Sequence, residues 1–243
     1  DDPRASFPVW GRPILLAPDP AGRARQNVLL ISLDTTRADH LTGWGYARAT
    51  SPELASFAAD GVVFEQAIAH FPSTTASHMS MLTSLQPCAH GVLVPDARST
   101  GGGLSPAATT LAEALAAAGW RTVAITENAL IHGDVGFNRG FDEYLDQVGR
   151  GEAGLGLFPE GIERAVKWIE RHGDQPFFVF LHTYQPHGPF KVPPFYRDLF
   201  PLAADASPVR RLEADYDAGL RYTDDLLANF LGQLGRRGIL DST

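Results

Sequence analysis

The chain has 243 residues, of which 44% are hydrophobic, so it can bury the core of one α/β domain, and its composition shows no sign of disorder. A formal net charge of −8, with 20 scattered Lys and Arg residues, excludes a broad nucleic-acid-binding face but leaves room for a small anionic substrate. The single cysteine, Cys88, excludes an internal disulfide and a multi-thiolate metal site.

The N-terminal region divides into an arm and the start of a domain. Five prolines at near-regular spacing predict an extended arm over residues 1–25, followed by an α/β domain over residues 26–243. Residues 27–34 form a continuous apolar run of strand length, which is typical of a strand buried on both faces. This strand ends at Asp34, and in open α/β sheets the carboxyl edge of the strands is where ligands bind.

Helices and strands then alternate along the chain. Ser51 as N-cap and Pro52 predict a helix to about Asp60, and a strand is expected over 62–68. The remaining predicted elements are a helix over 109–118, a strand over 121–126, a helix around 162–169, a strand over 177–181 and a long amphipathic helix over about 216–237. This order predicts a three-layer α/β/α sandwich with a largely parallel central sheet.

Asp34 is the first candidate for chemistry, because a carboxylate at a buried strand end needs a partner. A divalent cation bound by oxygen is one such partner. The alternative is a carboxylate that caps the following turn or pairs with Arg37. The strand alone does not decide between the two.

Thr74 and Thr75 lie at the start of a helical pattern that follows Phe71-Pro72. A hydroxyl at this position meets free N–H groups and the positive end of the helix dipole, which favour an alkoxide or an anionic ester oxygen. Metal coordination would lower the pKa of the hydroxyl enough for attack. The alternative interpretation is an ordinary N-cap threonine.

Two histidines lie at the same predicted edge of the sheet as Asp34. His182 follows the strand over 177–181, and His187 lies in the loop after it, within a Pro-His-Gly-Pro turn. Such side chains can protonate a leaving group or hold an anion, although a loop histidine is often merely solvated. Together with Arg37, His182 is a candidate substrate-binding residue.

Several motifs, in chain order, resemble the N-terminal part of a sulfatase. They are residues 27–41, Ser51 to Leu54, Thr74 to His78, His90 to Val92, Gly140 to Asp142 and His187 to Phe190. The resemblance covers nearly the whole chain from Asn27. It implies an alkaline-phosphatase-like α/β/α fold and hydrolysis of sulfate or phosphate esters with a divalent metal, which can be Ca²⁺, Mn²⁺, Mg²⁺ or Zn²⁺.

Position by position, the resemblance implies roles for four residues. Asp34 and Thr74 match metal ligands, and Thr74 also matches the nucleophile. His187 matches the histidine on the substrate side. His78 stands where an arginine steadies the nucleophile in sulfatases, which makes it a third catalytic candidate.

The chain also departs from the sulfatase pattern. Residues 74–78 replace the C-x-P-x-R motif, and Cys88 lacks the following Pro and Arg, so formylglycine cannot form by that route. The sequence is similar instead to the branch of the superfamily that keeps an unmodified Thr or Ser. Thr35 replaces a second aspartate, and the lysine and histidine expected after residues 121–126 are not evident. The family's last Asp and His ligands are expected on a strand after Thr243, so we expect a truncated domain with half a site.

These features predict a metal-dependent ester hydrolase in which Thr74 attacks sulfur or phosphorus. A phosphoryl or headgroup transferase of the same superfamily is the close alternative, and a non-catalytic fragment or binding domain is the alternative from another class. The expected partner is a small anionic ester, with no nucleic acid. Metal identity, membrane association and oligomeric state stay open, and exported relatives suggest an extracytoplasmic location by analogy.

Overall fold

A computed structural model describes residues 26–93, 103–127, 130–146 and 156–243, and the arm expected over 1–25 lies outside these ranges. Four strands form one sheet in the order β1-β4-β2-β3, and all three pairings are parallel. The strands are β1 (Val28–Leu33), β2 (Arg121–Thr126), β3 (Glu143–Asp146) and β4 (Phe177–Thr183). Their carboxyl ends therefore meet at one edge of the sheet.

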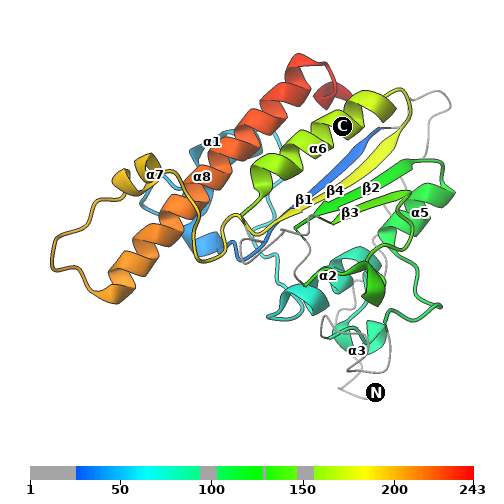
Figure 1. Ribbon diagram of the computed structural model, residues 1–243, viewed down its shortest axis with the longest axis horizontal. Coiled ribbons are helices and arrows are strands. Elements are labelled where there is room, and N and C mark those ends of the chain that lie inside the picture. The colour runs from blue at the N-terminus through cyan, green and yellow to red at the C-terminus, as the bar shows by residue number, and fades with distance from the viewer. Residues whose placement is uncertain (1–25, 94–102, 128–129, 147–155) are drawn as a thin grey trace.

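Helices cover both faces of this sheet (Figure 1). The long helices α6 (Phe158–His172) and α8 (Pro208–Arg236) lie on one face, and α2 (Thr74–Thr83) and α5 (Leu111–Ala117) lie on the other. The predicted α/β/α sandwich with a parallel sheet is confirmed.

The position of β4 between two other strands explains why residues 177–181 are continuously apolar. All seven of its residues are buried, because helices pack on both faces. Val179 and Leu181 face the α6 and α8 side, whereas Phe178 and Phe180 face the α2 and α5 side. The alternation follows from the pleat of a strand, in which successive side chains point to opposite faces.

Strand β1 differs from the expectation of full burial on both faces. Its side chains do pack on both faces, since Leu29, Ile31 and Leu33 join one core cluster and Val28 and Leu30 join the other. Most of them are only half-buried, however. The reason is that β1 pairs with β4 on one side and lies at the edge of the sheet in the described residues.

The other predicted helices form with shifts of a few residues at their ends. Helix α5 begins with a capping box in which the Thr110 hydroxyl accepts from the Glu113 N–H and the Glu113 carboxylate accepts from the Thr110 N–H. The remaining elements are α1 (Pro52–Ala58), α3 (Pro87–His90), α7 (Pro194–Asp198) and the short 3₁₀ turns Ala38–His40, Thr42–Trp44, Gly133–Val135 and Leu240–Ser242. Among the described helices none has the length and apolarity needed to cross a membrane.

The prediction of a strand over residues 62–68 is wrong. The segment is irregular, and Val62 and Ile68 are 82% and 84% exposed. Its β-branched and aromatic residues favour a strand locally, but a strand needs a hydrogen-bonded neighbour, and no ladder of the described sheet includes this segment.

The N-terminus of α1 is capped differently from the sequence expectation. Ser51 occupies the N-cap position, but its side chain makes no capping bond and accepts instead from the Thr42 N–H at 2.9 Å. The free N–H groups of Glu53 and Leu54 donate to the buried carboxylate of Asp224, at 2.9 and 2.8 Å. A residue of α8 therefore caps α1, and this contact joins two helices far apart in sequence.

We expect Asp224→Ala to lower the free energy of unfolding by about 2 kcal/mol, because it removes both acceptors and leaves two N–H groups unpaired. Urea unfolding followed by circular dichroism measures the change. The control is Asp174→Ala, since Asp174 is exposed in the turn before β4. A loss for Asp224→Ala no larger than that of the control would show that the capping bonds contribute nothing.

Candidate functional site

The register between β1 and β4 places four polar residues on one face of the sheet. Ser32 is the direct partner of His182 across the two strands. Asp34 lies two residues after Ser32, and Tyr184 lies two residues after His182. Because side chains alternate along a strand, all four are expected on the face that carries Leu30 and Phe180.

Helix α2 covers that face and adds two more residues at the same edge. Thr74 is its first residue, and His78 follows one turn later, so the two side chains lie on the same side of the helix. The imidazole of His78 reaches the sheet, where its Nε2 lies 2.7 Å from Ser32 Oγ. The helix and the two strands thus bring residues from three parts of the chain to one place.

Asp34, His78 and His182 form a compact buried cluster. One ligand atom from each of the three side chains lies within 4.8 Å of the other two. His182 Nε2 is 3.7 Å from Asp34 Oδ2, and the two imidazole rings are 5.0 Å apart and nearly perpendicular. The residues are only 8%, 5% and 1% exposed in chain order, so this is a polar cluster shielded from water.

The hydrogen bonds of His78 fix its tautomer. Nδ1 lies 2.8 Å from the Thr74 carbonyl oxygen, which can only accept, so Nδ1 carries the proton. Nε2 then has a lone pair and accepts from the Ser32 hydroxyl. Burial and the neighbouring His182 lower the pKa of His78 to about 4, so this imidazole is neutral at physiological pH.

His182 is the least satisfied member of the cluster. Neither of its ring nitrogens has a hydrogen-bond partner, although the residue is 1% exposed. The hydroxyl of Tyr184, whose ring packs edge-on against His182 at 4.5 Å, is also buried without a partner. Buried polar atoms without partners cost free energy, so their gathering in one place marks a site built for something other than packing.

The carboxylate of Asp34 stays ionised in this setting. Burial by itself would raise its pKa, but the imidazoles of His182 and His78 and the Thr74 hydroxyl together outweigh that effect and lower the pKa below its usual value. The cluster therefore contains one negative charge beside imidazole nitrogens.

Thr74 combines partial exposure with a helix N-terminus. Its side chain is half-buried, and no side chain caps the start of α2, because Ser73 makes no capping bond. Thr75, in contrast, is buried and its hydroxyl donates to the Leu130 carbonyl at 2.8 Å. Of the two threonines, Thr74 is the one that a substrate can reach.

His187 lies on the exposed side of this cluster. Its ring packs edge-on against Tyr184 at 5.8 Å, so Tyr184 separates it from His182. Nδ1 lies 2.6 Å from the Gly188 carbonyl and donates to it, which leaves Nε2 for another partner. His187 is therefore exposed near the site without belonging to the buried cluster.

Arg37 lies further out than its position in the sequence suggests. The guanidinium makes two hydrogen bonds to the Asp39 carboxylate, at 2.9 and 2.6 Å, and both side chains are largely exposed. Arg37 would have to break its ion pair with Asp39 before it could bind a substrate, so its substrate-binding role stays a prediction.

The loop after Asp34 is fixed by two adjacent residues of α8. The Tyr216 hydroxyl donates to the Thr35 carbonyl at 2.8 Å and accepts from the Arg37 N–H at 2.9 Å. Thr35 has a φ of 60°, a conformation that a β-branched residue rarely adopts, so these bonds hold a strained residue directly beside Asp34.

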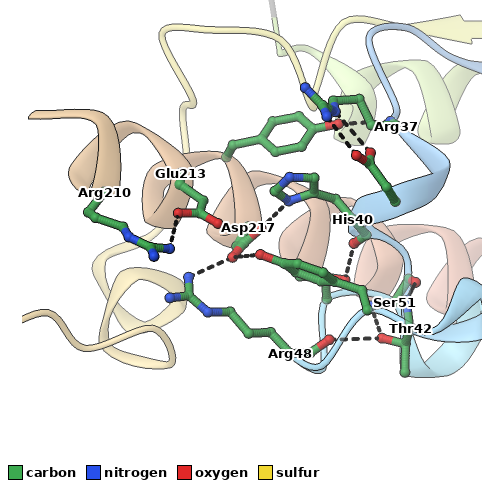
Figure 2. A network of polar contacts seen from close by, with 12 residues as sticks. Arg37, His40, Thr42, Arg48, Ser51, Arg210, Glu213 and Asp217 are labelled. Atoms are coloured by element: carbon green, nitrogen blue, oxygen red, sulfur yellow. Dashed lines mark hydrogen bonds and ion pairs between the residues drawn. The ribbon is translucent and has the colours of Figure 1, made fainter.

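The carboxylate of Asp217 is the second group of α8 that holds the segment after β1 in place (Figure 2). It is fully buried and binds His40 Nδ1 at 2.9 Å, the Tyr46 hydroxyl at 2.9 Å and Arg48 Nη1 at 2.7 Å. All three partners come from the segment between β1 and α1, so one charge on α8 organises that whole segment. Nothing in the local sequence signals this partnership, because about 170 residues separate the partners.

A buried glutamate was missed by the sequence reasoning. Glu127 follows β2 directly and is 2% exposed. Its carboxylate accepts from the Thr183 hydroxyl and from the Gly156 N–H, the latter at 2.8 Å. Glu127 bonds to Thr183 rather than to His182, because the two residues of β4 point to opposite faces. The signal was available, since Glu127 is a carboxylate at a predicted strand end, as Asp34 is.

Two of the sulfatase-like motifs have structural roles here. His90 is buried, accepts from the Val92 N–H and bonds Ser80 Oγ, which ties α3 to α2. Gly140 has a φ of +85°, and a β-carbon there would lie 2.1 Å from the Glu113 nitrogen, so only glycine fits.

Comparisons with known proteins agree with this architecture. The family model described as Sulfatase matches residues 26–243. Arylsulfatase A from Bos taurus is 34% identical over 118 residues, which are 47% of this chain and 23% of that protein.

Two solved structures show the same fold. The phosphonate monoester hydrolase of Agrobacterium radiobacter has a TM-score of 0.69 at 20% identity, over 90% of this chain and 61% of that chain. The C-terminal periplasmic domain of EcEptC from Escherichia coli, in complex with Zn, has a TM-score of 0.66 at 17% identity, over 87% and 60%. The chain thus spans about three fifths of the length of these structures.

We expect Glu127→Gln to alter the pH dependence of stability. Burial raises the pKa of Glu127 above its ordinary 4.5, and its hydrogen bonds to Thr183 and Gly156 offset this only in part. Protonation therefore favours the folded state. The wild-type contribution is fully present below the ordinary pKa and is lost as the pH rises through the raised pKa.

Glutamine does not titrate, so the stability of the variant relative to wild type should increase with pH across that window. Thermal melts between pH 3.5 and 8 measure the difference. The matched control is Glu163→Gln, because the exposed Lys167 pair lowers the pKa of Glu163 and gives the opposite sign. A difference for Glu127→Gln that is flat in pH would contradict the raised pKa.

Proposed function

The chain belongs to the sulfatase family, and from this we propose that it cleaves sulfate or phosphate esters with Thr74 as the nucleophile and a divalent cation at Asp34. The observation that carries the proposal is the position of Thr74, half-buried at the uncapped start of α2 and one helical turn before His78, which clusters with Asp34. A hydroxyl in this setting is accessible to a substrate, and the positive end of the helix dipole favours its deprotonation.

The chemistry proceeds by in-line displacement. Thr74 transfers its hydroxyl proton to a water molecule, and its Oγ1 forms a bond to sulfur or phosphorus while the bond to the leaving alcohol oxygen breaks. The N–H groups at the start of α2 stabilise the negative charge on the other oxygens of the transferred group. His187 donates a proton to the leaving oxygen from the exposed side, and His78 keeps the first turn of α2 in register through its bond to the Thr74 carbonyl.

Asp34 and Thr74 would hold the cation, which when bound lowers the pKa of the hydroxyl and neutralises charge on the transferred group. The unpartnered imidazole of His182 next to the carboxylate supports a bound group at this place. We assign His182, and Arg37 after release from Asp39, to the binding of the anionic substrate.

The covalent intermediate is an ester of Thr74, and it must be cleaved by a second nucleophile. Formylglycine releases its sulfate by elimination, but a threonine has no such route, so water must attack the transferred group. This difference favours phosphoryl over sulfuryl transfer. If another alcohol attacks in place of water, the same site is a transferase.

An extracytoplasmic location is part of the proposal. It is supported by the likeness to the periplasmic domain of EcEptC, which is a likeness of fold. The proposed partner is a small anionic ester, and the net charge of −8 argues against nucleic acid.

We expect Thr74→Ala to lower ester cleavage by the full-length protein about 1,000-fold or more, because removing a nucleophile removes the covalent route. Thr74→Ser should keep activity within about tenfold, since it keeps the hydroxyl. The measurement is release of p-nitrophenol from its sulfate, phosphate monoester and phosphonate monoester, with added Mn²⁺, Ca²⁺ or Zn²⁺.

Thr75→Ala is the matched control, because the buried Thr75 hydroxyl already donates to the Leu130 carbonyl. Mass spectrometry of a quenched reaction should find the covalent ester on a peptide with Thr74. Equal activity of Thr74→Ala and wild type would remove Thr74 from the mechanism. No cleavage of any ester by wild type with any of these metals would favour a binding domain over an enzyme.

A further inference from the structure

We propose that Tyr184 is a further catalytic residue, whose buried hydroxyl donates a hydrogen bond to an oxygen of the sulfuryl or phosphoryl group during its transfer. The inference rests on the proposed function, because it adds a contact with the substrate to the same site. The donor is a neutral phenol, so this contact is additional to the proposed cation and does not replace it.

Buried polar atoms without a partner gather at one edge of the sheet. In the described parts of the chain there are five such side-chain atoms, and they belong to Thr36, His182, Tyr184 and Gln185. All four residues lie within three positions of the carboxyl end of β1 or β4. Each unpaired atom costs free energy. Their confinement to the edge that carries the candidate site indicates that a bound group supplies the missing partners.

Other tyrosines of the chain show how a phenol is satisfied when it serves the fold. Four of them donate to an oxygen atom at 2.8 to 3.0 Å, namely Tyr46, Tyr144, Tyr196 and Tyr216. Tyr184 is only 2% exposed, and its hydroxyl has no partner among the described residues. A phenylalanine would fill the same space without an unpaired hydroxyl, so packing alone does not explain a tyrosine at this position.

Tyr184 lies between the buried cluster and the surface. Its ring packs edge-on against His182 at 4.5 Å and against the exposed His187 at 5.8 Å. His182 in turn contacts the ring of His78 at 5.0 Å, and His78 bonds the carbonyl of Thr74. A continuous row of rings therefore leads from the first turn of α2, where the proposed nucleophile lies, to the exposed loop.

The hydroxyl of Tyr184 is suited to donate a hydrogen bond. Burial, together with the negative charge of Asp34, raises the pKa of this phenol, so the proton stays on the oxygen. A fixed donor in a site shielded from water stabilises the charge that develops on the oxygens of a transferred group. Burial thus increases the effect of this hydroxyl on the reaction.

The hydroxyl is enclosed by the protein, so an oxygen of the substrate reaches it only when a neighbouring side chain shifts. His187 packs on the ring of Tyr184, and within the described residues its imidazole hydrogen-bonds only the Gly188 carbonyl. This exposed imidazole can therefore turn toward the leaving group at small cost. The same movement uncovers the surface side of Tyr184, so proton donation by His187 and the contact with Tyr184 are compatible.

The test is Tyr184→Phe in the full-length protein, a change that keeps the ring and removes the hydroxyl. We expect kcat/KM for p-nitrophenyl esters to fall about 100-fold, as for the loss of one fixed donor to a developing charge. Binding of inorganic sulfate and inorganic phosphate, measured by calorimetry, should weaken about tenfold. The Tm should stay the same or rise, because the change removes an unpaired buried hydroxyl.

Tyr144→Phe is the matched control. Tyr144 lies on β3 of the same sheet, and its hydroxyl donates to the Ile131 carbonyl at 2.9 Å. We expect the opposite result: the Tm falls by about 3 °C with the loss of one hydrogen bond, while cleavage and anion binding stay within about twofold of wild type. The pair separates a hydroxyl that stabilises the fold from one that acts on the substrate.

Unchanged cleavage and anion binding in Tyr184→Phe would overturn the inference, and so would a loss of activity that is accompanied by a fall in Tm as large as that of Tyr144→Phe. These results are separable from those for the proposed function. If Thr74→Ala abolishes cleavage and Tyr184→Phe does not impair it, this inference fails and the proposed function stands. If Tyr184→Phe weakens anion binding while Thr74→Ala cleaves the esters as fast as wild type, the contact stands and the proposed nucleophile is wrong.

Discussion

The parallel pairing of β1 with β4 is the constraint on which the candidate site depends. Ser32 stands opposite His182 in this register, and the pleat then brings Asp34 and Tyr184 to the same face and the same edge. A slip of one residue would turn His182 toward α6 and break the cluster. The apolar residues before these positions fix the register, because Leu30 and Phe180 fit one core and Ile31 and Leu181 fit the other.

The register alone does not hold Asp34 in place, because Asp34 lies just beyond the end of its strand. Helix α8 supplies the missing constraint through Tyr216, which bonds the carbonyl of the strained Thr35 and the N–H of Arg37, and through the buried Asp217 (Figure 2). Burying a charge is unfavourable unless it is fully paired. Asp217 has three partners, so the segment between β1 and α1 is tied to the same helix that packs on the sheet.

The sequence predicted much of the fold, because that part depends on local periodicity. The strands ending at Leu33, Thr126 and Thr183 and the amphipathic stripe of α8 follow from apolar patterns that need no knowledge of distant residues. The segment over 62–68 has a strand-like pattern but is irregular in the structure. A strand forms only where another strand lies alongside to hydrogen-bond with it, and the local sequence does not show whether one does. The local sequence also does not show that Asp224 caps α1 or that Asp217 binds the segment before α1, because about 170 residues separate the partners. Asp34, Thr74 and the two histidines could be nominated from sequence, but that His182 would lie buried and unpartnered required the register.

The opposite faces of one sheet edge also explain how two buried carboxylates acquire different properties. Asp34 meets imidazoles, which lower its pKa, while Glu127 meets a hydroxyl and an N–H, and burial raises its pKa. The strand pleat keeps the second carboxylate out of the cluster, so Asp34 is the only acidic side chain among the three clustered residues. A divalent cation bound there would carry more positive charge than the Asp34 carboxylate alone neutralises. The site would then attract an anionic ester, even though the chain as a whole has a net charge of −8.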